Sequence, residues 1–469
     1  MKKDQFFKGL SWLILLNLLI KPVWIFAIDR QVQNSVGHQT YGTYFALVSL
    51  SFVLLFIADA GLSNMLTQRI AAKEGISTVQ LLQVKAFFLL LYCIACCFIA
   101  WLTHVSEWDI LFYIIAIQVL NSLFIFLRSL LTAHQFFTTD AFFSVLDKSL
   151  LILLCSIAIY STLSPIDIIL FVQLQAGTTA LSVLILLAVL VRKKIFAKSH
   201  KQPLNTILKW TAPFAIIILL MSVHNKLDGF LLERLHPAGA LQAGIYASAF
   251  RLLDAANMVG YLSASFLVAF IARHKNDKEQ VQQVLLTTRH ALLFFAIAIS
   301  CFTFQFAPWI QQLLYHTTDD YGSRVLQLCL LSLPAYYLVH VYGSALTATT
   351  NFRLFNTVLG CSVVLNVLLN LWLIPLLGAL GCCIAALASQ YSCGIALYII
   401  TTRKLQLSYS AWSFFLYLVS AGILLLLFYY SKMAVNNVWI ILAAIAFLMA
   451  VVCITQRKFF KKLFFLFLK

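Results

Sequence analysis

The chain has 469 residues, of which 62% are hydrophobic and only 10% are charged, and its mean hydropathy is +0.93. A soluble domain carries about 25% charged residues, so a chain this apolar cannot cover itself with polar surface in water and is expected to lie in a lipid bilayer. The net charge of +17 would suggest nucleic acid in a soluble protein, but here the basic residues stand in short segments between apolar runs. That arrangement is typical of membrane proteins and excludes a nucleic-acid partner.

The first apolar run, residues 10–28, follows two N-terminal lysines in the position of a secretory signal peptide. It is long, contains Lys21 and Pro22, and ends before Asp29 without a cleavage site between small residues. We therefore interpret it as a retained first membrane span.

Fourteen apolar runs follow one another along the chain, separated by charged or polar segments. A membrane-spanning helix needs about 20 mostly apolar residues, so each run predicts one span. The expected fold class is an all-α integral membrane protein with about fourteen transmembrane helices. The spans are predicted near residues 10–28, 41–58, 84–102, 109–132, 141–161, 166–191, 210–232, 243–271, 287–308, 323–348, 354–374, 376–400, 412–430 and 437–455.

Basic residues are distributed unevenly between the two sides of the predicted membrane. The loops and helix ends on the side of the N-terminus hold 25 of the 33 Lys and Arg residues. The opposite side holds only Arg30, Arg234, Arg324 and Lys432. This bias predicts that both termini are cytoplasmic, and an even number of spans agrees with it.

A strongly basic segment, residues 192–209, divides the chain after the sixth predicted span, and the two sides resemble each other. On one side Gly42 opens an apolar run that closes at Arg69 after 27 residues; on the other, Gly244 opens one that closes at Arg273 after 29. The runs have the same predicted orientation, which indicates a parallel repeat. The predicted domains are an N-terminal six-helix lobe, a basic cytoplasmic linker, a C-terminal six-helix lobe, and a helix pair with a basic tail, at 1–191, 192–209, 210–402 and 403–469.

Residue types that often carry chemistry show no catalytic pattern. The eleven cysteines lie almost entirely inside apolar runs. Cys93, Cys96 and Cys97 have redox-like spacing but no histidine or βαβ context, so we interpret them as packing residues. The polar loops are short and contain no P-loop, HExxH or GxSxG motif. We expect no enzyme activity, no cofactor and no metal site.

Three stretches have a more specific pattern. The first runs from Tyr41 to Leu62, and the second from Asp228 to Arg251. The third places Asn and small residues around a Pro-Gly turn, at Asn356, Asn366, Asn370, Pro375, Gly378, Gly381, Ala385 and Ala386. Together they resemble the polysaccharide (O-antigen type) flippase family of the multidrug/oligosaccharidyl-lipid/polysaccharide exporter superfamily, over essentially the full length. The resemblance implies two pseudo-symmetric six-helix lobes around a central cavity that opens alternately to the two sides, plus a C-terminal helix pair.

The resemblance also implies a function. A member of this family would move a polyprenyl-diphosphate-linked oligosaccharide from the cytoplasmic to the outer leaflet of the bacterial inner membrane by alternating access. The process would be coupled to an ion and would serve a surface polysaccharide such as the O-antigen of lipopolysaccharide. The expected partners are the lipid-linked oligosaccharide and membrane lipid, with a polysaccharide polymerase as a further candidate.

Ionisable groups inside spans are costly, about 3 kcal/mol or more each at mid-membrane, and tend to face a wet cavity. The resemblance implies that spans 1, 7 and 8 line the interface between the lobes, which would bring Lys21, Lys226 and Arg251 into one cavity. Such cations bind phosphate well, so we hypothesise a cationic cavity for the diphosphate. Amide and aromatic candidates for sugar contacts are Asn225, Tyr246 and Asn257.

Each of these charges has a structural alternative. Arg251 and Asp254 are three residues apart and could pair along one helix face. Lys226, near the outer end of its span, could extend to water. Asp147 and Lys148 are interpreted as a buried pair inside a lobe, and His340 as structural.

Transport against a gradient requires a coupling ion. His224 and Asp228 are four residues apart on one helix face and could share a proton. Asp254 is a further candidate for ion coupling.

Three other functions compete with this interpretation. A multidrug extruder of the same superfamily would bind cations with cavity carboxylates and have about twelve spans, whereas the basic intramembrane residues favour an anionic substrate. A peptidoglycan-precursor flippase would also have fourteen spans and a cationic cavity. A membrane polysaccharide polymerase or glycosyltransferase would need a larger polar loop than the chain contains.

Overall fold

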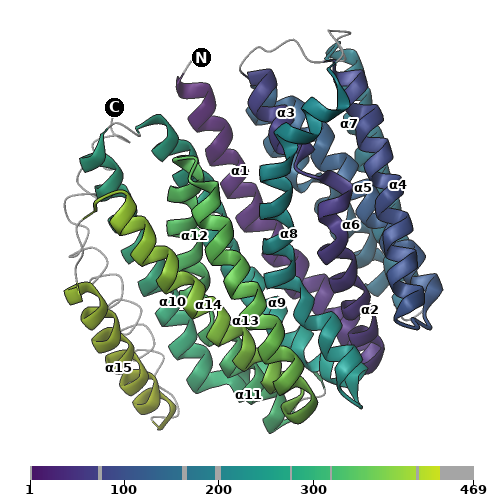
Figure 1. The fold of residues 1–469 in the computed structure, drawn as a ribbon. Coiled ribbons are helices and arrows are strands. Elements are labelled where there is room, and N and C mark those ends of the chain that lie inside the picture. Colours follow the sequence, from purple (N-terminus) through teal and green to yellow (C-terminus); the bar gives the residue numbers. More distant parts are fainter. Residues whose placement is uncertain are drawn as a thin grey trace. The chain divides into compact units, whose positions relative to one another are not determined.

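The computed structural model describes residues 3–71, 77–160, 166–195, 202–274, 277–316, 319–407 and 411–433. All regular elements in these ranges are helices (Figure 1). Twelve helical segments within these ranges are long and apolar enough to cross a membrane. The all-α, multi-pass membrane fold predicted from the composition is therefore confirmed.

The twelve segments correspond to thirteen of the fourteen predicted spans. The first two predicted spans form one continuous segment, Leu15–Asp59. The last predicted span, 437–455, lies outside the described residues. The expected helix pair after residue 403 is thus described only for its first member, α15 (Ala411–Met433).

Two compact units divide the chain, residues 1–247 and 248–469. The division falls inside helix α9 (Gly239–Arg273) rather than in the basic segment 192–209. The predicted lobes and linker remain a prediction, because the units group residues by proximity and not by internal repeat. The first unit also contains α1 (Lys3–Val23), η1 (Trp24–Asp29), α2 (Arg30–Asp59), α3 (Leu62–Ala71), α4 (Thr78–Leu102), α5 (Trp108–Ala133), α6 (Phe137–Tyr160), α7 (Ile168–Arg192) and α8 (Leu204–Leu235).

Helical structure continues from α1 into α2 where the sequence predicted a polar loop. Pro22 cannot donate a backbone hydrogen bond, and the π-helix η1 begins two residues later, at Trp24. The chain direction changes at Gly37, whose φ of 78° and ψ of 166° are not helical. A left-handed φ of this kind favours glycine, so Gly37 separates the two predicted spans inside a run of helical residues.

Two further breaks occur where the sequence places small residues. Ala60 (φ 45°) and Gly61 (φ 77°) end α2 and turn the chain into α3. An added Cβ on Gly61 would collide with the backbone of Thr211 in α8, so this turn requires glycine. Gly378 (φ 58°) separates α13 (Phe352–Leu377) from α14 (Ala379–Lys404), which confirms the predicted Pro-Gly turn.

The core of the first unit lies among α3, α4, α5, α6 and α7, where large aliphatic and aromatic residues are fully buried. Helix α2 packs along α8 (Figure 1). Helix starts are capped by short polar side chains, as at Ser77 for α4 and Asp167 for α7, because these oxygens satisfy the otherwise unpaired N–H groups.

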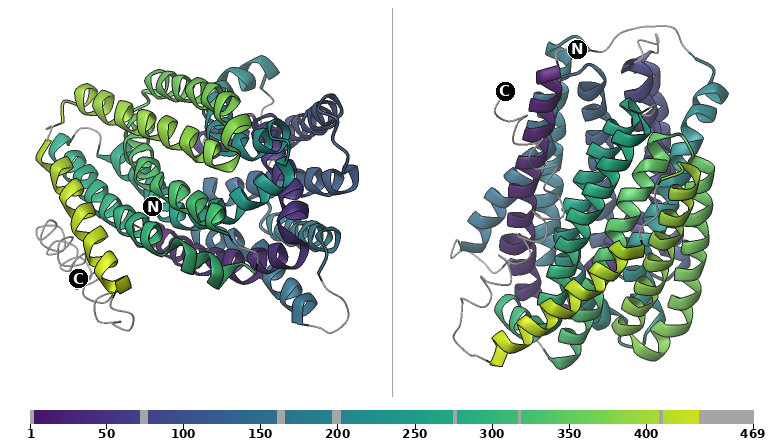
Figure 2. Two further views of the ribbon diagram at one scale, coloured as in Figure 1. Left: turned by 90° about the horizontal axis from the view of Figure 1, so that it is seen from below. Right: turned by 90° about the vertical axis from the view of Figure 1, so that its left-hand side faces the viewer.

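The second unit consists of most of α9 together with α10 (Lys278–Leu314), α11 (Asp320–Leu331), α12 (Leu333–Ala348), α13, α14 and α15. Ser332 and Pro334 separate α11 from α12 within one predicted span, because Pro is accepted in the first turn of a helix. Helix α15 lies against α10 at the edge of this unit (Figure 2), with Cys301, Leu424 and Phe428 buried between them.

Candidate functional site

Lys21 lies in the last turn of α1, directly before Pro22 and η1, and is half-buried. One turn earlier, Asn17 donates a 2.8 Å hydrogen bond to Ser144 Oγ in α6. This buried contact joins α1 to α6, along which α1 packs. The ammonium group of Lys21 is therefore carried by a helix end with a fixed position inside the first unit.

Asp147 and Lys148 are neighbours in α6 and lie inside the first unit. Lys148 Nζ is 3.5 Å from Asp147 Oδ2 and 5.2 Å from the ring centroid of Trp24. Trp24 in turn stacks on Phe171, with ring centroids 5.8 Å apart. The ammonium of Lys148 thus has a carboxylate and an aromatic face as partners, in line with the structural interpretation of this pair.

Four predicted residues stand in α8: His224, Asn225, Lys226 and Asp228. His224 and Asp228 are buried. His224 Nε2 has no hydrogen-bond partner among the described residues, whereas Asp228 Oδ2 accepts a 3.4 Å hydrogen bond from Tyr246. The structure therefore brings Asp228 together with Tyr246, a residue that the sequence analysis assigned to sugar contacts.

Asn225 and Lys226 are half-buried on another part of α8. Lys226 Nζ lies 5.7 Å from the ring centroid of Phe52 in α2, within the range of a cation–π interaction. The partial exposure of both side chains leaves room for contact with a solute.

Arg251, Asp254 and Asn257 follow one another along α9, in the second unit, and all three are half-buried. Asn257 Oδ1 lies 3.0 Å from His340 Nε2 in α12, so His340 donates in the tautomer that is protonated at Nε2. Tyr337, one turn earlier in α12, donates to the backbone oxygen of Ala256. These contacts give His340 and Asn257 a role in packing α9 on α12.

The predicted cationic cavity draws on both units. Lys21, Asn225, Lys226 and Tyr246 belong to the first unit, and Arg251 and Asn257 belong to the second. Each unit is described separately, so the meeting of these side chains in one cavity remains a prediction. Lys21 and Lys226 have the chemistry for an anion, because a half-buried ammonium can bind phosphate as a point charge.

A buried polar cluster near the start of α2 was missed by the sequence analysis. Tyr41 donates a 2.7 Å hydrogen bond to Asp29 Oδ2, and both side chains are buried. Gln33 Nε2 donates to the backbone oxygen of Gly244 over 2.9 Å and also lies 3.0 Å from His38 Nδ1. Asp29 and Gln33 fall between the first two predicted spans, because polar residues interrupt the apolar pattern there.

The two glycine motifs that the sequence analysis aligned as repeats lie against each other. A Cβ on Gly42 would collide with the backbone of Ala240 and Gly244. One on Gly244 would collide with the backbone of His38. The start of α9 and the start of the α2 span can approach this closely only because both positions lack a side chain.

Two fully buried cations were also missed. In the first unit, Lys85 Nζ lies 2.7 Å from Asp59 Oδ1 and 2.7 Å from Ser122 Oγ. In the second unit, Arg289 is buried among tyrosines and donates to the hydroxyl of Tyr342 over 3.2 Å. Both residues stand at the start of a predicted span, where a basic residue is expected at the membrane surface. Their burial was therefore not predicted from the sequence.

Within the ranges that the structure covers, no three or more His, Cys, Asp or Glu side chains are grouped in a way that could hold a metal ion. The cysteines in those ranges, including Cys93, Cys96 and Cys97, are free thiols. The packing interpretation of these three cysteines agrees with this state.

Comparison with protein families places the chain among transport proteins. The model of the family described as polysaccharide biosynthesis protein matches residues 6–270, more than half of the chain. The MatE family model matches residues 213–372. No curated protein matches the sequence significantly.

Several solved structures share the fold. The lipid II flippase MurJ, in an inward closed conformation, gives a TM-score of 0.67 at 14% identity, covering 96% of this chain and 99% of that one. A MATE transporter of Vibrio cholerae gives 0.61 at 15% identity, with 86% and 97% covered. A MOP superfamily transporter from Pyrococcus furiosus gives 0.57 at 14% identity, with 85% and 93% covered. At these identities the likeness establishes the fold, which is that of flippases and transporters.

Proposed function

The chain belongs to the polysaccharide biosynthesis protein family, and on that basis we propose that it flips a polyprenyl-diphosphate-linked oligosaccharide from the cytoplasmic to the outer leaflet. Alternating access between two lobes would carry the sugar and the diphosphate across, while the polyprenyl tail stays in lipid. The product would serve the assembly of a surface polysaccharide such as O-antigen, with a polysaccharide polymerase as the consumer.

One observation supports the anionic substrate above all: basic side chains stand inside the membrane-spanning helices. Lys21 in α1, Lys226 in α8 and Arg251 in α9 are half-buried, each in a helix long enough to span the bilayer. A charge inside a span is costly and marks a substrate pathway in many membrane proteins. A diphosphate would compensate several such charges at once, by bidentate hydrogen bonds to Arg and by point-charge contacts with Lys.

We place the protein in the bacterial inner membrane with both termini in the cytoplasm. The uneven distribution of Lys and Arg supports this orientation. Reporter fusions after residue 200, in the basic segment, and after residue 236, in the next predicted loop, would test it. A cytoplasmic signal from the first and a periplasmic signal from the second are expected, and the reverse pattern would refute the orientation.

For ion coupling we propose Asp228, with His224 as a neighbour on the same face of α8. Asp228 is buried and accepts a hydrogen bond from Tyr246, so its protonation would change a contact between α8 and α9. Replacing Asp228 with Asn keeps the hydrogen-bond acceptor and removes the titratable group. The variant should lose the pH dependence of transport; transport with unchanged pH dependence would exclude Asp228 as the coupling group.

The central experiment is complementation of a bacterium that lacks its own O-antigen flippase. Surface polysaccharide is measured for the native chain, for a Lys21→Ala, Arg251→Ala double variant, and for Arg324→Ala as a control. Arg324 is exposed at the start of α11 and has no place in the proposed cavity. Rescue by the native chain and the control, but not by the double variant at equal expression, is expected. Rescue by all three would keep the function and discard the cationic cavity.

The MatE match over residues 213–372 favours a multidrug extruder as the second candidate. An extruder of cations would draw on cavity carboxylates, for which Asp228 and Asp254 are the nearest candidates by position. Resistance of the complemented strain to cationic drugs, without restored polysaccharide, would move the assignment to this function. A membrane polymerase or glycosyltransferase remains the alternative of a different class, and would appear as new glycan linkages formed by the purified chain.

A further inference from the structure

The second unit holds a buried guanidinium whose charge is not neutralised by any carboxylate in the described ranges. Arg289 in α10 is 1% exposed. The acidic residues of residues 248–469 are few, at Asp254, Asp277, Glu279, Asp319 and Asp320. None of them lies within ion-pair distance of Arg289 in the described ranges, and the remaining residues of this unit contain no Asp or Glu.

The neighbours of Arg289 are aromatic, and they include the hydroxyl groups of Tyr342, Tyr398 and Tyr417. Nη1 donates to the hydroxyl of Tyr342, and Cζ lies 5.7 Å from the ring centroids of both Tyr398 and Phe414. Nε and Nη2 are buried and have no hydrogen-bond partner among the described residues. These two N–H groups point to the same side of the planar guanidinium, as the fork that binds a carboxylate or phosphate with two parallel hydrogen bonds.

An apolar cavity of about 390 Å³ follows Arg289 along the same helix face. Leu293, Ile297 and Phe304 of α10 line it. Leu293 and Ile297 follow Arg289 at steps of four residues, and Phe304 follows Ile297 after seven, so all four residues lie on one face of the helix. Phe414 of α15, which contacts Arg289, lines it as well. The volume lies in the range of roughly 300–1,000 Å³ that small-molecule pockets occupy.

The cavity opens toward the lipid-facing surface of the unit. Leu418 of α15 is 73% exposed and Phe304 of α10 is 42% exposed, and both line it. Both stand in helices long and apolar enough to span the membrane, where an exposed apolar side chain contacts acyl chains. An acyl chain can therefore enter the cavity from the bilayer.

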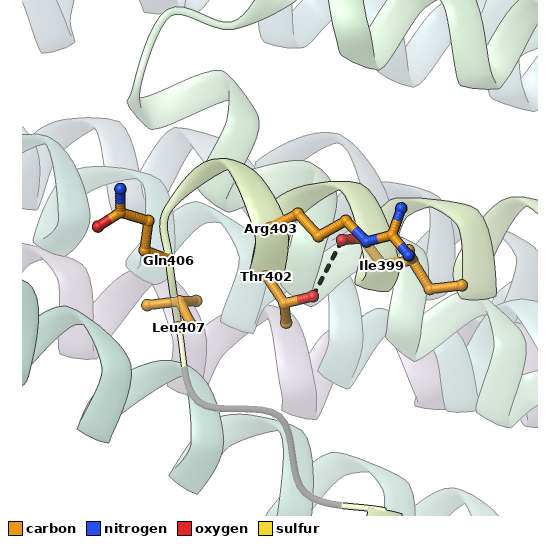
Figure 3. A pocket seen from close by; sticks show the side chains of 5 residues that line it. All are labelled: Ile399, Thr402, Arg403, Gln406 and Leu407. Atoms are coloured by element: carbon orange, nitrogen blue, oxygen red, sulfur yellow. Dashed lines mark hydrogen bonds between the residues drawn. The ribbon is translucent and has the colours of Figure 1, made fainter.

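A second pocket, of about 650 Å³, lies toward the start of α10, on the other side of Arg289 from the apolar cavity. We call it the polar pocket, because three of its five lining residues are polar. Its lining includes Thr402, Arg403 and Gln406 at the end of α14, where Figure 3 shows Thr402 donating to the backbone oxygen of Ile399. Lys278, at the start of α10, donates to Gln406 Oε1 over 3.3 Å, so the start of α10 lies beside the end of α14 at this pocket.

Along α14, Tyr391 lines the apolar cavity, Tyr398 covers Arg289, and Arg403 lines the polar pocket. Along α10, the same order runs from the cavity through Arg289 to Lys278. Apolar, anion-binding and basic polar zones thus follow one another along two helices. This order matches the tail, phosphate and polar headgroup of a phospholipid.

The depth of Arg289 fits this reading. It stands in the first turn of the predicted span 287–308, at the end that the Lys and Arg distribution assigns to the cytoplasm. Phosphate groups of the cytoplasmic leaflet lie at that level, and acyl chains lie deeper, where the apolar cavity is. Anionic lipids are concentrated where basic residues gather at this surface.

We propose that the second unit binds an anionic phospholipid of the cytoplasmic leaflet, with its phosphate on the Nε–Nη2 edge of Arg289 and one acyl chain in the cavity between α10 and α15. This lipid is a resident component of the transporter, separate from the lipid-linked oligosaccharide. It neutralises the buried charge of Arg289 and joins α15 to the rest of the unit.

Binding is tested by native mass spectrometry of the purified full chain in detergent with phosphatidylglycerol, phosphatidylcholine, polyprenyl phosphate or inorganic phosphate added. The native chain should bind phosphatidylglycerol at least about tenfold more tightly than phosphatidylcholine, because two charge-assisted hydrogen bonds depend on Arg289 and the headgroup charge favours the basic pocket. Arg289→Gln should lower the affinity for phosphatidylglycerol at least about tenfold. Arg353→Gln, an exposed residue at the start of α13 on the same predicted membrane side, serves as the matched control and should bind as the native chain does.

A second variant tests the acyl-chain cavity with the guanidinium intact. Ala421 in α15 lines the cavity, and Ala421→Trp should fill it and weaken phosphatidylglycerol binding, even if Arg289→Gln fails to fold. Equal binding of both phospholipids, or equal binding by the native chain and both variants, would overturn the proposal. Binding of inorganic phosphate as tight as that of phosphatidylglycerol would reduce the site to a free-anion site. Polyprenyl phosphate that binds where phosphatidylglycerol does not would reassign it to the substrate.

Discussion

Lys85 in the first unit and Arg289 in the second are both fully buried cations in membrane-spanning helices, and the protein stabilises them in different ways. Lys85, 0% exposed, has a carboxylate partner in Asp59 and a hydroxyl in Ser122. Among the described residues, Arg289 has tyrosine hydroxyls and two aromatic faces as neighbours but no carboxylate. The charge of Lys85 is thus neutralised within the chain, whereas Nε and Nη2 of Arg289 have no acceptor in the described ranges and could bind an external anion.

The comparison separates a structural charge from a binding charge. Two charged groups that neutralise each other in a buried ion pair leave little net charge for a ligand to bind. Removing one of them leaves the other buried without a counter-charge, which causes a large loss of stability. A cation held by aromatic rings keeps its capacity for an anion, and removing it takes away no partner charge. The expected effects of mutation should therefore differ in size between the two sites, which makes the comparison testable.

The largest effect is expected for Asp59→Asn. The amide keeps the acceptor oxygen that Ser63 uses but leaves the Lys85 ammonium buried without a counter-charge. Removing one partner of a buried ion pair costs about 3–5 kcal/mol of folding free energy. Thermal unfolding in detergent should show a strongly lowered midpoint. An unchanged midpoint would mean that Lys85 reaches water or sheds its proton, and the contrast with Arg289 would fail.

Most of that loss should be recovered by replacing the pair as a whole. In Asp59→Leu, Lys85→Met both charges are absent, so no buried charge remains unpaired. Exchange of a buried pair for apolar residues of similar size is often neutral, and we expect unfolding within about 1–2 kcal/mol of the native chain. If the double variant is as unstable as Asp59→Asn, the two side chains stabilise the protein by fixing the shape of the α2–α3 turn, and not by neutralising each other's charge.

A smaller effect is expected for Arg289→Gln measured in detergent without added phospholipid. The variant loses the hydrogen bond to Tyr342 and the two ring contacts, but it also removes an uncompensated buried charge. These terms oppose each other, and a net change of about 1–2 kcal/mol in either direction is expected. Added phosphatidylglycerol should raise the unfolding midpoint of the native chain and not that of the variant. Equal stabilisation of both would contradict the anion-binding role.

The smallest effect is expected for Arg128→Gln. Arg128 Nε lies 2.8 Å from Asp140 Oδ1, with 22% of the arginine side chain and 8% of the aspartate side chain exposed. A partly exposed pair contributes roughly 0.2–1 kcal/mol, because water screens both charges. A loss of stability as large as that of Asp59→Asn would show that partial exposure does not lower the contribution of an ion pair in this protein.

The membrane fold could be predicted from the sequence because spans are long and physically constrained. The helix count was less secure at the N-terminus, where Asp29, Gln33 and Gly37 predicted a loop. Asp29 Oδ2 is bound by Tyr41, and Gln33 Nε2 is bound by the backbone of Gly244, inside the helical region. Such partners, some of them distant in sequence, are not visible in the composition.

The sequence could propose candidate site residues only where a charge stood inside an apolar run. Lys21, Lys226 and Arg251 met that condition and are half-buried, and their meeting in one cavity stays a prediction. Lys85 and Arg289 begin their predicted spans, where a basic residue normally marks the membrane surface. Their burial depends on neighbouring helices, through Asp59 and the tyrosines, so the linear pattern gave no signal for it.

Helix α9 carries residues of both units on one unbroken helix. Its first turns are held in the first unit by the backbone approach of Gly42 and Gly244, and its later turns in the second unit by Tyr337 and His340. The division at residues 247 and 248 falls inside the helix. Because an unbroken helix fixes the directions in which its side chains leave it, Tyr246 and Arg251 keep their orientation relative to each other along α9, although they are assigned to different units.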